Sequence, residues 1–199
     1  MSDLPTLELA HTMMSEDDAL RFLEGHRISR SGRTMDLKAQ IVGEFVKSIR
    51  VPGYFPPLPE LRQQLRTMVT LMDEPAPPLA RVEDIQIPGP AGALPARVYD
   101  ASGERGSARP AVAYFHGGGW VQGDLETHHG LCARLALRSG ALVIAVDYRL
   151  APEHPFPAAV DDCLASYRWL HAHAWEIGVD PARIAVAGDS AGGNLAAVV

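Results

Sequence analysis

The sequence is poor in cysteine and has no hydrophobic run long enough to cross a membrane. Its 199 residues include only 2 cysteines, Cys132 and Cys163, which lack the spacing of a metal site. We interpret them as buried thiols in a reducing compartment and therefore expect a cytoplasmic protein. No segment approaches the roughly 18 apolar residues of a membrane span. The acidic start, MSDLPTLELAHTMMSEDD, lacks the basic and then apolar pattern of a secretory signal.

Basic residues are also in the minority, with 18 Lys and Arg against 24 Asp and Glu and a net charge of −6. This balance argues against nucleic acid or an anionic membrane surface as the main partner. The HExxH metal signature and the GxxxxGK[ST] phosphate loop are both absent from the sequence. We therefore expect no metal and no cofactor. The hydrophobic content of 47% is that of an ordinary globular protein with one core.

The hydrophobic period changes after residue 80, which divides the chain into residues 1–80 and residues 81–199. The first region contains three segments of helical period: 16–27, 36–48 and 58–72. The last of these presents one apolar face: Leu61, Leu65, Met68 and Met72. Helices of this kind either pad a core or cover a site built by later residues, and the sequence leaves both alternatives open.

Residues 81–199 alternate between strand-like and helix-like segments. Strands are predicted at 81–90, 94–100, 111–115, 141–150 and 183–190, and helices at 126–140 and 156–175. The first two strands suit a half-exposed hairpin, and the other three are apolar runs typical of buried parallel strands. The pattern predicts an α/β sandwich. The final helix-like segment stops without a capping residue, and the strand before it would form an open edge, so we interpret the chain as the first part of a larger domain.

The strongest motif is Gly188-Asp189-Ser190-Ala191-Gly192, between a predicted strand and a predicted helix. A serine at such a sharp turn has its hydroxyl lifted clear of the backbone, and the tight turn requires small neighbours. The amides that follow lie at a helix N-terminus, where unpaired N–H groups can face an anion. The motif indicates a nucleophile; the alternative is a glycine-rich turn with an incidental serine.

A second glycine-rich turn, His116-Gly117-Gly118-Gly119-Trp120, follows the strand AVAYF. Its unshielded amides can stabilise a developing oxyanion. A dinucleotide-binding loop also follows a strand, but it would require a third glycine at position 122, where the sequence has Gln122. Together with the serine turn, the loop indicates half of an acyl-transfer site.

The remaining triad partners have no candidates. Only 9 residues follow Ser190, and none is His, Asp or Glu. In the α/β-hydrolase order the acid and then the histidine follow the serine, so no upstream histidine qualifies. His128 and His129 are adjacent and point in different directions on a helix. His116 lies in the glycine loop, and we expect it to brace that loop by hydrogen bonding.

HGGGW, GDSAGGN and the intervening VDYRLAPEHPFPAAVDD resemble the hormone-sensitive-lipase-like group of α/β-hydrolases, the bacterial family IV esterases. The resemblance is close over about residues 80–199 and looser over the N-terminal helices. It implies a three-layer α/β-hydrolase fold of eight mainly parallel strands, the second antiparallel, in which the N-terminal helices help form a cap over the acyl pocket. The closing strands, the triad acid and the triad histidine would lie beyond residue 199.

The resemblance also implies roles for individual residues. Ser190 matches the nucleophile, and the oxyanion-hole amides match Gly118, Gly119 and Ala191. His116, Gly117 and Asp189 match positions that shape the loop and the turn. The implied activity is hydrolysis of short-chain carboxylic esters. The alternatives are a non-catalytic small-molecule binder of the same fold, such as the plant gibberellin receptors, or an inactive fragment. The open sheet edge suggests a homo-oligomer or a complementing C-terminal chain.

Overall fold

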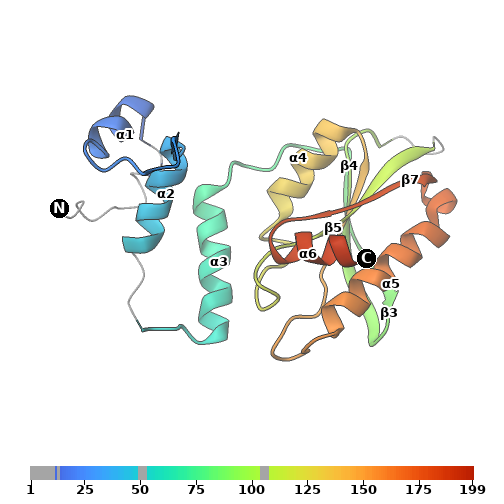
Figure 1. Cartoon of the computed structure of the whole chain (residues 1–199). Coiled ribbons are helices and arrows are strands. Elements are labelled where there is room, and N and C mark those ends of the chain that lie inside the picture. The colour runs from blue at the N-terminus through green and yellow to red at the C-terminus, as the bar shows by residue number, and fades with distance from the viewer. Residues whose placement is uncertain (1–11, 13, 49–52, 104–107) are drawn as a thin grey trace. The chain divides into compact units, whose positions relative to one another are not determined.

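The computed structural model describes residue 12 and residues 14–48, 53–103 and 108–199, which divide into two compact units (Figure 1). The units are residues Met1–Phe55 and Pro56–Val199. The predicted division after residue 80 separates a cap from a catalytic region, and as a functional division it stays a prediction. In the described part of the chain, no helix combines the length and the hydropathy that a membrane span requires.

The first unit is a small helical body with a short hairpin. Its elements are α1 (Glu16–Phe22), β1 (Ser29–Arg30), β2 (Arg33–Thr34) and α2 (Leu37–Ser48). The helix predicted over 16–27 ends earlier, at Phe22, and the segment that follows is bonded by the buried side chain of Gln40. Its amide donates to the carbonyl of His26 at 2.7 Å and its oxygen accepts from the amide of Ile28 at 3.2 Å. The hairpin was not predicted.

The second unit contains α3 and a five-stranded sheet with helices on both faces. Its helices are α3 (Leu58–Met72), α4 (His129–Ser139), α5 (Ala158–Ala172), the 3₁₀ helix η2 (Ala174–Ile177) and α6 (Ala191–Val198). Its strands are β3 (Arg81–Gly89), β4 (Gly92–Asp100), β5 (Arg109–Phe115), β6 (Leu142–Val146) and β7 (Val179–Gly188). The helix predicted over 58–72 and all five predicted strands are therefore present.

The sheet order is β3-β4-β6-β5-β7. β4 is antiparallel to both neighbours, whereas β6, β5 and β7 are parallel. The second strand is thus antiparallel, as the resemblance implied. β7 starts earlier than predicted and contains Pro181, which an edge strand tolerates because its outer N–H groups need no ladder partner. Among the described strands, β7 pairs with β5 alone.

Two apolar clusters occupy the two faces of this sheet and explain its three layers. On one face, Phe115 and Ile144 pack with Cys163 of α5 and Leu195 of α6. On the other, the core residues are small on the helix and large on the strands: Cys132, Ala133 and Ala136 of α4, with Tyr99, Tyr114 and Val143. Alternation along β5 sends neighbouring side chains to opposite faces. The predicted three-layer α/β sandwich is confirmed (Figure 1).

Candidate active site

Two turns begin side by side at the carboxyl ends of neighbouring parallel strands. β5 and β7 pair with Phe115 opposite Gly188, so the next residues of each strand enter adjacent turns. One turn is the loop His116–Trp120, and the other contains Asp189 and Ser190. Ligands of open α/β sheets bind at the carboxyl ends of strands, so this edge is the expected place for a site.

Ser190 occupies the strained position of the strand-to-helix turn. It is exposed, it precedes α6, and its φ of 50° and ψ of −117° lie outside the regions that non-glycine residues favour. The turn is fixed on both sides, since the amide of Gly192 donates to the Asp189 carbonyl at 2.8 Å and that of Asn194 donates to the Ser190 carbonyl at 3.1 Å. This turn leaves Ser190 exposed at the start of α6, and its role as a nucleophile stays a prediction.

Gly192 shows why the second glycine of the motif is required. A Cβ atom at this position would overlap the carbonyl oxygens of Phe115 and His116. The first turn of α6 therefore lies directly against the start of the glycine loop. The G-x-S-x-G spacing thus encodes a close approach of two backbone segments as well as a sharp turn.

The loop His116–Trp120 and the start of α6 both contain backbone amides without a hydrogen-bond acceptor among the described residues. Gly118 has a φ of 124°, and its carbonyl accepts from the amides of Val121 at 3.2 Å and Gln122 at 3.1 Å. Within the described ranges, the amides of Gly118, Gly119 and Ala191 donate no hydrogen bond. Unpaired N–H groups are uncommon in folded proteins unless they face water or a ligand. The structure thus brings together the residues from which the predicted oxyanion hole is drawn.

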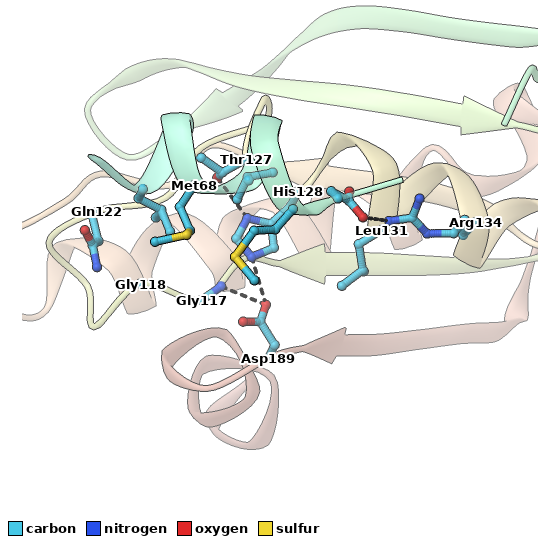
Figure 2. A pocket seen from close by; sticks show the side chains of 13 residues that line it. Met68, Gly117, Gly118, Gln122, Thr127, His128, Leu131, Arg134 and Asp189 are labelled. Atoms are coloured by element: carbon cyan, nitrogen blue, oxygen red, sulfur yellow. Dashed lines mark hydrogen bonds and ion pairs between the residues drawn. The ribbon is translucent and has the colours of Figure 1, made fainter. Parts of the chain in front are cut away.

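The carboxylate of Asp189 links the serine turn to the glycine loop. Its Oδ1 accepts from the Gly117 amide at 2.9 Å and from the Tyr114 hydroxyl at 2.8 Å, and it lies 3.2 Å from Nε2 of His128 (Figure 2). Burial, and then the Asp189 carboxylate, raise the pKa of Tyr114, so its hydroxyl keeps the proton that it donates. Asp189 therefore contacts the loop that it was predicted to shape.

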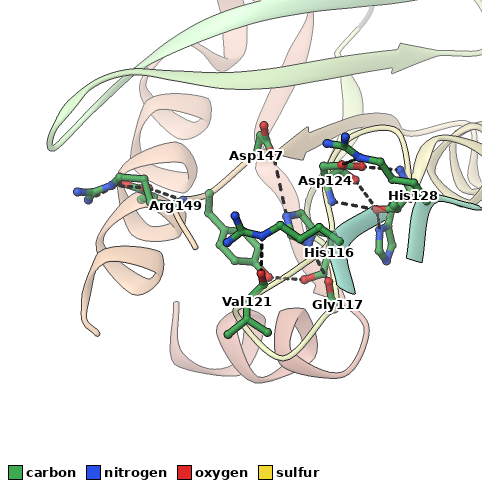
Figure 3. Close-up of polar contacts among 12 residues, drawn as sticks. His116, Gly117, Val121, Asp124, His128, Asp147 and Arg149 are labelled. Carbon is green, nitrogen blue, oxygen red and sulfur yellow. Dashed lines mark hydrogen bonds and ion pairs between the residues drawn. The ribbon is translucent and has the colours of Figure 1, made fainter. Parts of the chain in front are cut away.

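His116 is buried beneath this loop and bonds to it. Its Nδ1 lies 2.8 Å from the Gly117 carbonyl, which can only accept, so Nδ1 carries the proton. The ring stacks on Tyr148 with a centroid separation of 4.3 Å. Burial lowers the pKa of His116 to about 4, so the ring is neutral at pH 7. Nε2 lies 4.0 Å from Oδ1 of Asp147, which Figure 3 shows above the ring.

A pocket of about 470 Å³ lies between α3, α4 and the two turns. Its apolar wall comes from α3 and α4: Leu65, Met68, Val69, Met72 and Leu131. Gly117, Gly118 and Asp189 contribute the opposite wall (Figure 2). The apolar face of α3 therefore lines this pocket together with Gly117, Gly118 and Asp189, and its role as a cap over a substrate stays a prediction.

Arginine side chains fasten α3 to the loops around the site. Arg62 donates to the Val121 carbonyl at 2.8 Å and to both carboxylate oxygens of Glu153 at 2.8 Å. Arg66 pairs with Asp124 at 2.6 Å. Figure 3 places Val121 and Asp124 on the loop that carries His116. The cover over the pocket is therefore attached through ion pairs as well as apolar contacts.

Three residues of the site carry no sequence signal: Tyr114, His128 and Asp147. Tyr114 reads as an ordinary strand residue, and Asp147 as the polar end of a strand. His128 and His129 do point apart, since Nδ1 of His129 lies 3.3 Å from the Tyr99 hydroxyl. The pairing of β5 with β7 brings Tyr114 to Asp189, and the start of α4 places His128 against the same carboxylate. Among the described residues, no group of three or more His, Cys, Asp or Glu side chains could hold a metal ion.

Residues 112–199 match the family model of the alpha/beta hydrolase fold. The chain is 50% identical over 141 residues to esterase LipI of Mycobacterium tuberculosis. This match covers 70% of the chain and 43% of LipI. The solved esterase of Pyrobaculum calidifontis is 50% identical, with a TM-score of 0.66, over 71% of the chain and 46% of that protein. An ester hydrolase from the Lake Arreo metagenome is 40% identical, with a TM-score of 0.72, over 80% of the chain and 50% of that protein. The chain thus spans half or less of each of these relatives.

Proposed function

Because the chain belongs to the hormone-sensitive-lipase-like group of the α/β-hydrolase fold family, we propose that it is the N-terminal part of a carboxylic-ester hydrolase. Ser190 is the nucleophile, and the amides of Gly118, Gly119 and Ala191 form the oxyanion hole. The substrates are short-chain acyl esters. The triad acid and base are supplied by residues beyond this chain.

The observation that supports this proposal is the strained backbone of Ser190, with unpaired amides on its own turn and on the glycine loop that Asp189 contacts. A non-glycine residue with φ of 50° and ψ of −117° is strained, and such strain persists only where the surroundings impose it. The neighbouring amides of the described loop and helix start have no acceptor in the fold. An exposed hydroxyl next to free amide donors is the arrangement that acyl transfer requires.

In the proposed reaction the histidine base takes the proton of the Ser190 hydroxyl while its oxygen attacks the ester carbonyl. The tetrahedral oxyanion accepts hydrogen bonds from the three amides. The histidine then returns its proton to the departing alcohol, which leaves an acyl-enzyme. Water, deprotonated by the same histidine, adds to the acyl carbonyl, and the carboxylic acid leaves as the proton returns to Ser190.

The pocket beneath α3 supports an acyl-binding role. Its wall of Leu65, Met68 and Met72 is apolar, and Gly118 lies on the opposite side. An acyl chain placed there would remove apolar surface from water while its carbonyl remained near the loop amides. Methionine side chains adapt to different shapes, which suits a pocket that accepts several short chains.

Substitution of the proposed nucleophile tests the function directly. In the complete protein, we expect Ser190→Ala to lower p-nitrophenyl butyrate hydrolysis by about 10⁴-fold or more. Ser139→Ala, which alters an exposed serine at the end of α4, should leave the rate unchanged. A complete protein that binds esters without turnover would support the receptor-like alternative. Hydrolysis by residues 1–199 alone would contradict the proposal that the base lies beyond them.

We also propose a cytoplasmic location and pairing at the open edge of β7. Both cysteines are buried and free, as in proteins from reducing compartments. The outer side of β7 offers unpaired backbone groups to a second copy or to a complementing C-terminal chain.

A further inference from the structure

Three groups from different parts of the second unit converge on one oxygen beside the proposed nucleophile. Oδ1 of Asp189 lies 2.8 Å from the Tyr114 hydroxyl at the end of β5 and 2.9 Å from the Gly117 amide. The third group is Nε2 of His128, 3.2 Å away at the start of α4. Figure 2 shows the His128 ring and the Asp189 carboxylate facing each other, joined by one of the dashed lines.

The direction of the His128 contact follows from hydrogen-bonding capacity. A carboxylate oxygen accepts hydrogen bonds, so Nε2 of His128 carries the hydrogen and donates a hydrogen bond to Oδ1 of Asp189. The other ring nitrogen, Nδ1, lies 3.0 Å from the Thr127 hydroxyl. That hydroxyl accepts from the Asp124 amide at 2.9 Å and donates to the Asp124 carbonyl at 2.9 Å. Thr127 therefore holds the back of the ring while Nε2 points toward the site.

The surroundings of His128 restrict its ring further. Its centroid lies 5.5 Å from that of His116 and 6.2 Å from that of Tyr114. The side chain is mostly buried, with an exposed fraction of 13%, whereas that of Asp189 is 45% exposed. The more exposed carboxylate thus receives a hydrogen bond from a side chain that has little freedom to move.

Asp189 in turn connects both halves of the proposed machinery. It immediately precedes Ser190, and its carbonyl accepts from the Gly192 amide at 2.8 Å. Its carboxylate accepts from the amide of Gly117, which immediately precedes Gly118 in the glycine loop. Rotation of this carboxylate would release Gly117 and alter where the next two amides point. The orientation of Asp189 therefore controls the relation between nucleophile and oxyanion donors.

We propose that His128 is a positioning residue for ester hydrolysis: its Nε2–H fixes the Asp189 carboxylate, which aligns the amides of Gly118 and Gly119 with Ser190. The inference rests on the proposed function. His128 acts through Asp189 and does not serve as the general base. Misplacement of the donors affects the transition state more than the bound ester, because the oxyanion forms only after attack.

The hydrogen bond can be tested without any activity, in the 199-residue chain labelled with ¹⁵N. Long-range ¹H–¹⁵N spectra of the histidine rings should show Nε2 of His128 protonated, with the signal assigned from its loss in His128→Gln. In His128→Leu, the Gly117 amide should shift upfield and exchange with solvent faster, whereas His128→Gln should retain both properties because its amide group can still donate. An unprotonated Nε2, or equal behaviour of the two variants, would overturn the inference.

Kinetics of the complete protein with p-nitrophenyl butyrate test the consequence. His128→Leu should lower kcat by about 10- to 100-fold with KM changed by less than about twofold. His128→Gln, of similar volume but with a donor, should recover most of kcat. An unchanged kcat in His128→Leu would refute positioning. Loss of activity in both variants to the level of Ser190→Ala would instead make His128 a proton-transfer group.

Failure of the proposed esterase function and failure of the proposed role of His128 give different results. A wild-type protein without esterase activity would refute the proposed function, while the spectra of the 199-residue chain would still decide whether His128 holds Asp189. An active wild-type protein with the same kcat as its His128→Leu variant would refute the inference alone.

Discussion

The two walls of the pocket are built by different means. The wall made by the serine turn and the glycine loop consists of backbone segments in direct contact, where even one added carbon atom at Gly192 would overlap a carbonyl oxygen. The wall made by α3 consists of flexible apolar side chains and arginine ion pairs. The comparison indicates that the first wall fixes chemistry and tolerates little change, whereas the second can vary and select substrates.

The largest effect on the free energy of unfolding should come from a side chain placed between the serine turn and the glycine loop. Gly192→Ala should lower the free energy of unfolding by about 3 kcal/mol or more, because a rigid backbone must move to accept the Cβ atom. Urea unfolding followed by circular dichroism measures this change.

Gly193→Ala is the matched control in the same helix, where the new Cβ would lie 3.2 Å from the Gly188 carbonyl oxygen. Its helix propensity gain of up to about 1 kcal/mol opposes the mild crowding, so its stability should stay within about 1 kcal/mol of the wild type. Equal unfolding midpoints for the two variants would mean that the walls do not differ as described.

Removing the arginine contacts of α3 should have a moderate effect on the free energy of unfolding. Arg62→Met removes the Glu153 ion pair and two carbonyl hydrogen bonds, and we expect a loss of about 1–2 kcal/mol, discounted because the ion pair is partly exposed. Hydrogen exchange should accelerate in α3 and remain slow in β5 and β6. Arg66→Met, which removes one exposed ion pair, should cost less than about 1 kcal/mol. Uniformly faster exchange across the sheet would show that α3 is integral to the core.

The smallest effect on stability should come from the carboxylate of Asp147, which lies 4.0 Å from the His116 ring. Burial, and then the charge of Asp124, raise the pKa of Asp147 to about 6 from a normal value of 3.8. The folded state therefore binds more protons than the unfolded state between about pH 4 and pH 6, so this group reduces stability as the pH rises through that window. Arg66 and Arg97 oppose the shift, and neutral His116 does not compensate the charge.

Asp147→Asn should accordingly raise stability at pH 7 by less than about 1 kcal/mol, since the side chain is 37% exposed and solvent screens its charge. The gain should shrink as the pH falls below about 6 and be small by pH 4, close to the normal pKa of 3.8 at which the unfolded carboxyl also takes up a proton. Thermal unfolding at pH 4, 5, 6 and 7 measures the difference. A gain that is the same at every pH would have to come from packing rather than charge.

Much of the fold could be predicted from the sequence because its signals are local. The period of 58–72 predicted α3 with its correct bounds, and short apolar runs predicted the parallel strands. The helix predicted over 16–27 was too long, and the segment after it bonds instead to the Gln40 side chain of α2, through His26 and Ile28. Such a contact leaves no periodic trace in the sequence.

For the candidate site, the sequence by itself determined the two turns, because a strained serine and a close backbone approach demand glycine and small residues at fixed spacing. Only the tertiary structure decided what surrounds them. The sheet order brings Tyr114 to within 2.8 Å of Asp189 across 75 residues of chain, and it sets His128 on the same oxygen. Ordinary tyrosine and histidine side chains acquire such roles from the pairing of strands, since neither their type nor their neighbours in the sequence specify the partner.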